Sequence, residues 1–199
     1  KNLDRHIKNL QGFGQTVVVC FNRYAADTDE EIEFCRQHCA EMGIGFAVNN
    51  AFNEGGAGAE ELANLVVNTI EGTPSQPLVY AYSDEQSIEE KAQEVVRKVY
   101  GGKGATFTPA AKKMLQKIEE LGLNHYPICI AKTQYSFSAD QKAYGVPEGF
   151  SIAIRDVVIN QGSEFIVLIA GEILRMPGLP KVPQAEKIDI VNGEIEGLS

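Results

Sequence analysis

The sequence predicts an α/β fold: a three-layer, mostly parallel sheet with crossover helices, followed by a smaller α/β subdomain at the carboxyl end. Two observations support this. Strand-like and helix-like stretches alternate through the first half of the chain, as they do in βα units. Later, residues 152–159 and 165–170 form apolar runs that suit strands covered on both faces.

The chain opens with a helical segment at residues 2–10 and a β-branched strand at residues 16–21. A helix is predicted from the capping run at residues 27–31 to about Met42. Its first turn carries acids, which the helix macrodipole favours at that end. Gly43 is a suitable residue to end it.

A second strand is predicted at residues 45–48, a loop at residues 49–58 and a helix from Ala59 to about Ile70. The Pro- and Gly-containing stretch at residues 71–77 then punctuates the chain. We therefore expect an α/β portion at residues 1–72, which continues a domain that begins upstream. A carboxyl-terminal α/β subdomain would span residues 73–199.

In the second portion, a strand is predicted at residues 78–82, and the next helix has its apolar positions on one face between Ile88 and Val99. The glycine-rich stretch at residues 101–104 stops this helix. A further helix at residues 108–121 and a strand at residues 128–131 follow.

After the two apolar runs near the end comes Met176-Pro177-Gly178-Leu179-Pro180-Lys181. Proline has a fixed φ and no backbone N–H, so this segment continues neither a strand nor a helix. We expect it to form a fixed corner.

Composition excludes several classes of protein. At 199 residues, with 44% hydrophobic residues, the chain is long enough for one large or two small globular domains. A formal charge of −9 and scattered basic residues argue against a nucleic-acid partner. No apolar run reaches the length of a membrane span, and the first residues lack a signal-peptide hydrophobic region. These features predict a cytoplasmic protein without a membrane partner.

The four cysteines predict neither a disulfide framework nor a metal centre. Cys20 and Cys129 lie in strand-like runs, while Cys35 and Cys39 are four residues apart on one helix, beside His38. A closed zinc site needs four ligands, and no second pair stands at a suitable spacing. Reduced, structural cysteines are the preferred interpretation.

Two glycine clusters resemble anion-binding turns. Gly55-Gly56-Ala57-Gly58 precedes a predicted helix and offers backbone N–H groups to a phosphate or carboxylate, although glycines are also common at simple strand–helix turns. The stretch at residues 101–104 lacks the spacing of a phosphate loop and is interpreted as a helix stop.

Tyr24 and Phe52 each lie just past the carboxyl end of a predicted strand, the edge where open α/β sheets bind their ligands. Two aromatic side chains on neighbouring loops can sandwich a flat heterocycle. Position alone equally allows both to pack in the core.

Two polar features have structural explanations as well as chemical ones. Residues 132–136 follow the strand at 128–131, where they either bind an anion or cap the sheet. Arg155 and Asp156 stand inside an apolar run and predict a buried ion pair.

Three tracts together resemble one known family. They are N-R-Y-A-A-D-T at residues 22–28, A-K-T-Q-Y-S-F-S at residues 131–138, and G-F-S-I-A-I-R-D-V-V-I-N-Q-G-S-E-F-I-V-L-I-A-G-E-I-L-R-M-P-G-L-P-K-V-P from residue 149. The chain resembles the carboxyl-terminal part of formate–tetrahydrofolate ligase, also called 10-formyltetrahydrofolate synthetase. The resemblance extends over essentially all of it.

The resemblance implies that Tyr24 and Phe52 flank a planar ring, either the pterin of folate or the adenine of a nucleotide. The implied ring-binding residues are Tyr24, Ala25, Val48, Phe52, Gly55 and Gly56. The chain departs from the family pattern at two of them. Phe52 stands where the family usually has tryptophan, and Ala25 where a proline is common.

For the complete enzyme, the resemblance implies ATP-dependent formation of formyl phosphate from formate and formyl transfer to N10 of tetrahydrofolate. The implied cofactors are Mg-ATP and a monovalent cation, bound mostly upstream. The chain has no phosphate loop and no initiator methionine, so we expect the carboxyl-terminal part of a larger homo-oligomeric enzyme, inactive alone. The alternative is a non-catalytic folate- or nucleotide-binding or oligomerisation module.

Overall fold

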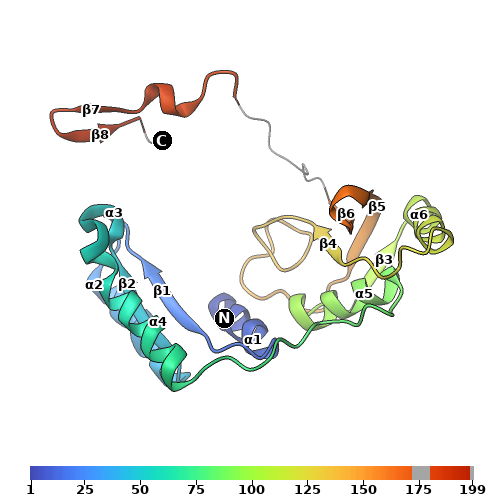
Figure 1. The fold of residues 1–199 in the computed structure, drawn as a ribbon, viewed down its shortest axis with the longest axis horizontal. Helices are drawn as coiled ribbons and strands as arrows, with labels where there is room; N and C mark the ends of the chain where they lie inside the picture. Colours follow the sequence, from blue (N-terminus) through green and yellow to red (C-terminus); the bar gives the residue numbers. More distant parts are fainter. Residues whose placement is uncertain (172–179, 198–199) are drawn as a thin grey trace.

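The computed structural model describes residues 1–171 and 180–197 and has an α/β fold, as predicted (Figure 1). Strands β1 and β2 form a two-stranded sheet, a four-stranded sheet has the order β3-β5-β6-β4, and β7 pairs with β8. The pairs β1–β2, β3–β5 and β4–β6 are parallel, whereas β5–β6 and β7–β8 are antiparallel. The strands are therefore divided among separate sheets.

The first part of the chain builds the β1–β2 sheet and its covering helices. Its elements are α1 (Asn2–Gly12), β1 (Val18–Asn22), α2 (Asp29–Glu41), β2 (Gly45–Asn49), α3 (Ala51–Glu54), the 3-10 helix η1 (Gly55–Ala59) and α4 (Glu60–Gly72). The predicted start of α2 is confirmed, because Thr28 and Glu31 form a reciprocal capping box. The predicted loop at residues 49–58 is wrong in part, since α3 and η1 occupy most of it.

This small sheet lies between two helical layers. On one face, a Cβ added to Gly45 would meet Leu65 of α4 at 3.0 Å, so glycine permits the close approach of that helix. On the other face, Ile7 of α1, Cys39 of α2 and Ile44 form a small buried cluster with Val19 and other partly buried side chains. The result is a helix–sheet–helix sandwich around two parallel strands.

The second part contains the four-stranded sheet. Its elements are α5 (Ile88–Val95), the π-helix η2 (Val96–Tyr100), β3 (Ala105–Phe107), α6 (Pro109–Glu120), β4 (Ile128–Ala131), β5 (Ile152–Asn160), the 3-10 helix η3 (Gln161–Ser163), β6 (Phe165–Ala170), the 3-10 helix η4 (Gln184–Lys187), β7 (Asp189–Val191) and β8 (Glu194–Glu196). Helices α5 and α6 and the sheet enclose the main core: Ile88, Ala92, Val96, Ala105, Ala111, Ile118, Ile152, Ile154, Val157, Ile166, Leu168 and Ala170.

Helix α1 joins the two parts. Asn9 donates from Nδ2 to the carbonyl oxygen of Val99 at 2.9 Å, and Arg5 donates to the carbonyl oxygens of Lys98 and Val99. The ring of His6 lies 4.8 Å from that of Phe137. Helix α1 is thus hydrogen-bonded to the end of η2, just before Gly101, which adopts a left-handed conformation.

The predicted strand at residues 78–82 is wrong. The segment is irregular: Val79 donates its backbone N–H to the carbonyl oxygen of Phe13, and Lys98 donates from Nζ to that of Ala81. A β-propensity run becomes a strand only where another strand pairs with it, and here a helix end and a lysine satisfy the backbone instead. The short strand β3 was missed for the converse reason, since it forms by pairing with β5.

The predicted buried ion pair of Arg155 and Asp156 is also wrong, because both residues are exposed. The register shifts between Ile154 and Asp156, which is the signature of a β-bulge. Asp156 accepts a hydrogen bond from the backbone N–H of Val157. In the predicted corner at residues 176–181, residues 176–179 lie outside the described part of the chain.

Candidate functional site

Tyr24 and Phe52 lie at the same edge of the β1–β2 sheet. The strands are parallel and in register, with Asn22 opposite Asn49, so both aromatic residues follow carboxyl ends that stand side by side. The backbone ladder continues one step further, because Arg23 donates its N–H to the carbonyl oxygen of Asn49 at 3.0 Å. Tyr24 is 68% exposed and Phe52 is 80% exposed, so neither ring packs in the core of this chain.

We call residues 24–27, the turn that carries Tyr24, the tyrosine rim. It is closed by Asp27, whose carboxylate accepts from the backbone N–H of Tyr24 at 2.7 Å and whose own N–H donates back to the carbonyl oxygen of Tyr24. Arg23 forms an exposed ion pair with Asp29 at 3.0 Å. Ala25 is exposed on the turn. The aromatic ring is thus displayed on a braced turn.

We call residues 50–58, which carry Phe52, the phenylalanine rim. Its anchor is Asn50, which donates its backbone N–H to the carbonyl oxygen of Gly58 at 2.9 Å. The side chain of Asn50 donates to Glu54 at 2.7 Å and accepts from Asn53 at 2.8 Å. These bonds fold the rim back over the end of β2.

The glycine positions of this rim differ in whether the structure requires glycine there, and why. Gly55 follows α3 with a positive φ of 61°, a conformation that favours glycine. A Cβ on Gly58 would lie 2.5 Å from the backbone of Asn50, so only glycine fits there, whereas a Cβ on Gly56 would meet nothing within 4 Å. Gly58 therefore closes the rim, whereas the family resemblance implied Gly55 and Gly56 as the site residues.

The surroundings do not favour an anion at this glycine cluster. Residues 55–59 are themselves a 3-10 helix, and the first turn of α4 carries Glu60 and Glu61. These carboxylates already occupy the positive end of the helix macrodipole. The charge pattern suits a neutral ring rather than a phosphate.

Two polar residues missed by the sequence analysis connect the rims. Asn49, half-buried at the end of β2, donates from Nδ2 to Oδ1 of Asn22 at 3.4 Å and accepts from the backbone N–H of Ala51 at 3.1 Å. The one sequence signal for Asn22 and Asn49 is their position directly after apolar strand residues. Val48, a predicted ring-binding residue, is half-buried opposite Phe21 on the neighbouring strand.

A cavity of about 460 Å³ adjoins the tyrosine rim on the α2 side. Phe21, Phe34 and Cys35 supply its apolar and thiol lining, and its polar lining is entirely acidic: Asp27, Glu30 and Glu31. An acidic wall disfavours phosphate or carboxylate groups by like-charge repulsion. This hollow is therefore unsuited to a phosphate or carboxylate group.

The polar segment after β4 proves to be a self-contained turn. Lys132 donates from Nζ to the carbonyl oxygens of Thr133 and Ser136 and lies 4.7 Å from the centre of the Tyr100 ring. Burial lowers the pKa of Lys132 and raises the pKa of Tyr100 to about 12. Ser136 and Ser138 are buried and hydrogen-bonded to each other. The polar side chains of the segment are therefore bonded within it and to the loop that follows, as Ser136 is to the carbonyl oxygen of Ala143.

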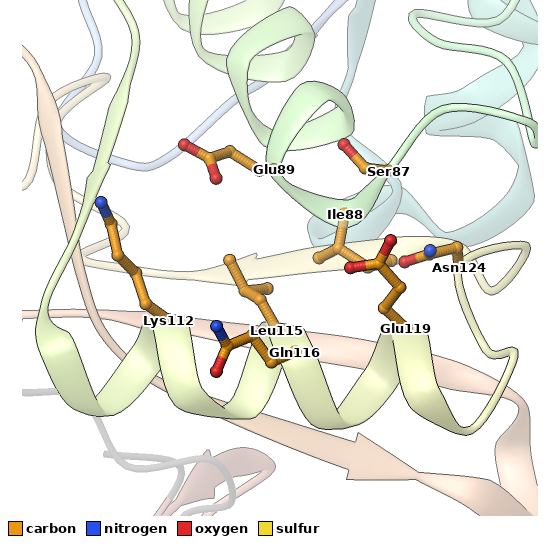
Figure 2. Close-up of a pocket in the computed structure, with 8 residues that line it drawn as sticks. All are labelled: Ser87, Ile88, Glu89, Lys112, Leu115, Gln116, Glu119 and Asn124. Carbon is orange, nitrogen blue, oxygen red and sulfur yellow. The ribbon is translucent and has the colours of Figure 1, made fainter.

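Other hollows lie away from the two rims. Figure 2 shows one of about 310 Å³ between the start of α5 and α6, lined by Ser87, Ile88, Glu89, Lys112, Leu115, Gln116, Glu119 and Asn124. Ser87 already caps α5 by accepting from the backbone N–H of Glu90. A larger cavity of about 820 Å³ lies beside residues 78–85. Neither contains a predicted ring-binding residue.

All four cysteines are free thiols: Cys39 is buried, Cys35 is half-buried, and Cys20 and Cys129 are exposed. Within residues 1–171 and 180–197, no three His, Cys, Asp or Glu side chains come together as a metal site would require. In the same described part, no helix combines the length and apolar character needed to cross a bilayer.

The chain is thus an α/β protein with exposed aromatic residues at the carboxyl edge of two parallel strands, the edge where open α/β sheets bind their ligands. A protein-family model described as formate–tetrahydrofolate ligase matches residues 1–199. The chain belongs to this family.

Individual relatives agree with this assignment. Proteins named formate–tetrahydrofolate ligase are 58% identical to the chain in Bacteroides fragilis, 59% in Bacteroides thetaiotaomicron and 60% in Parabacteroides distasonis. Each match covers the whole of this chain but only 36% of the relative. The chain thus spans about a third of the length of the relatives that it matches.

Proposed function

We propose that the full-length protein is an ATP-dependent ligase that formylates tetrahydrofolate at N10, with formate activated as formyl phosphate. Within it, this chain supplies the wall that binds a substrate ring between Tyr24 and Phe52. One observation carries the proposal: two exposed aromatic side chains follow register-paired parallel strands in a member of the formate–tetrahydrofolate ligase family.

The physical support for a ring site comes from exposure and bracing together. Large aromatic side chains left in water contribute little to folding, and here each stands on a turn closed by its own hydrogen bonds. A flat heterocycle between them would bury apolar area and gain offset stacking. Ala25, Val48, Gly55 and Gly56 would line the same pocket.

The phosphates of ATP would be bound by another part of the enzyme, for two reasons. The acids near both rims repel phosphate, and the chain lacks a phosphate loop. Within the described residues, no three His, Cys, Asp or Glu side chains come together as a Mg²⁺ site would require, and the family resemblance implies that Mg-ATP and the monovalent cation are bound mostly upstream. We assign those ions, and the handling of formate, to an amino-terminal phosphate-loop portion.

Residues 1–72 would continue a sheet that begins in that portion. A two-stranded sheet is marginal alone, and α4 leaves Val67 and Ile70 52% and 64% exposed on its outer side. Further strands and a further layer would cover these surfaces. Residues 73–199 would form the second subdomain of a cytoplasmic homo-oligomer.

Turnover tests the proposal. The 199 residues alone should show neither formate-dependent ATP cleavage nor 10-formyltetrahydrofolate synthesis, whereas the full-length protein should show both. Robust synthesis by the 199 residues alone would refute the assignment of phosphate chemistry to another portion. Calorimetry of the full-length protein with tetrahydrofolate and with ADP should then show which ring loses affinity in Tyr24→Ala.

A non-catalytic role is the alternative. If the full-length protein binds tetrahydrofolate or ADP without turnover, it is a binding module. If it only self-associates in sizing chromatography, the chain serves assembly. Either result would overturn the ligase assignment.

A further inference from the structure

We propose that Asn49, together with Asn22, is a positioning residue that sets the gap between the tyrosine rim and the phenylalanine rim. This inference rests on the proposed ring site. It assigns a role to Asn49, which lies outside the tracts that carry the family resemblance, and to Asn22, which begins one of those tracts but is not among the implied ring-binding residues.

The inference starts from the two hydrogen bonds of one side chain. The Nδ2 atom of Asn49 donates to Oδ1 of Asn22, at the end of β1 and two residues before Tyr24. Its Oδ1 atom accepts from the backbone N–H of Ala51, the residue before Phe52. A single amide therefore contacts the bases of both aromatic rims.

The position of this amide matters because the regular ladder stops here. The last backbone bond between the two strands is that from Arg23 to Asn49, and the turns that carry the rings are otherwise closed within themselves. Beyond that bond, the Asn49 side chain adds a second link between the strand ends from which the two turns start, and it would limit how far each turn adjusts independently. Ordering them on ligand binding would cost affinity, which a preset gap avoids.

The chemistry of the position selects asparagine. The two contacts require one donor and one acceptor on the same short side chain, which asparagine supplies and aspartate does not. Leucine has a similar size but would leave the backbone N–H of Ala51 without this acceptor.

The strongest variant is Asn49→Ala in the full-length ligase, because it removes both contacts. We expect affinity to fall roughly threefold to tenfold, the scale of one net hydrogen bond. The loss should affect the same ligand that Tyr24→Ala weakens, measured by calorimetry with tetrahydrofolate and with ADP. The kcat at saturating substrate should be unchanged, because the residue positions the ring and takes no part in bond making.

Two conservative variants separate the contacts. Asn49→Asp keeps the acceptor for Ala51 and loses the donor to Asn22, so it should lose less affinity than Asn49→Ala. Asn22→Asp keeps the acceptor for Asn49 and should be close to wild type. The double variant Asn22→Ala/Asn49→Ala should bind no more weakly than Asn49→Ala, since the two residues share one hydrogen bond. Asn68→Ala, at an exposed position of α4, is the matched control and should change neither affinity.

The outcomes are distinguishable. If Tyr24→Ala and Phe52→Ala weaken a ring and Asn49→Ala does not, the inference is wrong and the ring site stands. If none of the three changes any affinity, the ring site itself is wrong and the inference fails with it. If Asn49→Ala weakens tetrahydrofolate, ADP and formate alike, or lowers kcat in proportion, its role is general structure and the inference is overturned.

Discussion

The two parts of the molecule differ in how their sheets are supported. The four-stranded sheet around β5 and β6 is packed against α5 and α6 and encloses the main core, with Ile152, Ile166 and Leu168 fully buried. The two-stranded sheet around β1 and β2 has only a small cluster of Ile7, Cys39 and Ile44. Tyr24 and Phe52, the two exposed aromatic residues of the proposed site, nevertheless belong to the part with the smaller core.

Under the proposed function, the two parts would have different roles. A thick core holds a fold together through buried apolar area, while a binding edge needs side chains that remain accessible. In the thin part, order comes from hydrogen bonds made by short polar side chains, such as Asp27 and Asn50. The comparison therefore predicts large stability effects in one part and large binding effects in the other.

The largest effect should come from Leu168→Ala in β6. The side chain is fully buried in the main core, so its truncation should cost about 2–5 kcal/mol of unfolding free energy through lost burial and a residual cavity. Denaturant unfolding measures it. Gln37→Ala, at an exposed position of α2, is the control and should change stability by about 0.5 kcal/mol or less. Equal costs would remove the distinction between the two parts.

Gly58→Ala should have the next largest effect, about 1–3 kcal/mol of stability together with weaker ring binding. The added Cβ would lie 2.5 Å from the backbone of Asn50, which must shift and open the phenylalanine rim. Gly56→Ala offers a matched control, because its Cβ meets nothing within 4 Å. Unfolding and calorimetry on both variants would show whether the close approach matters.

Tyr24→Ala and Phe52→Ala should each weaken ring binding by about 1–3 kcal/mol, the scale of a lost aromatic contact and its burial. Their stability should change by less than about 0.5 kcal/mol, because both side chains are largely exposed. Phe52→Trp should be tolerated and should bind at least as tightly, since the larger ring adds stacking area. Unchanged affinity in folded Tyr24→Ala and Phe52→Ala would remove both residues from the site.

The smallest effect concerns pH. The hydrogen bond from His38, whose Nε2 lies 2.7 Å from Oδ1, lowers the pKa of Asp4 below its ordinary value of 3.8. Because the folded-state pKa is depressed, this contact stabilises the fold above pH 3.8, and its contribution is lost as pH falls through the folded-state pKa. Wild type should therefore exceed Asp4→Asn in stability at neutral pH, and the difference should vanish in acid. A difference independent of pH would contradict this origin.

Local signals predicted many of the individual elements. The capping run before α2, the boundaries of β4 and β6, the proline at the start of α6 and the glycine stop after η2 are all recognisable within a few residues. They are local because caps, propensities and left-handed glycines act on neighbouring backbone groups. The same locality explains why Tyr24 and Phe52 could be identified as lying just after strands.

Which distant segments pair with each other could not be predicted from the sequence and is known only from the structure. Residues 78–82 have the composition of a strand but no strand beside them, whereas β3 forms because β5 lies next to it. The Arg155 and Asp156 side chains turn out to solvent at a bulge that the apolar pattern conceals. In each case the outcome depends on a neighbour that no local pattern reveals.

The candidate site shows the same limit most clearly. The sequence alone indicated the family, the two aromatic residues and the strands that precede them. The register that sets Asn22 beside Asn49, 27 residues away in sequence, and the contact that admits only glycine at Gly58 arise when the chain closes on itself. The sequence determines the chemistry of each side chain. The distances between side chains depend on how distant segments pack, and this packing exists only in the folded chain.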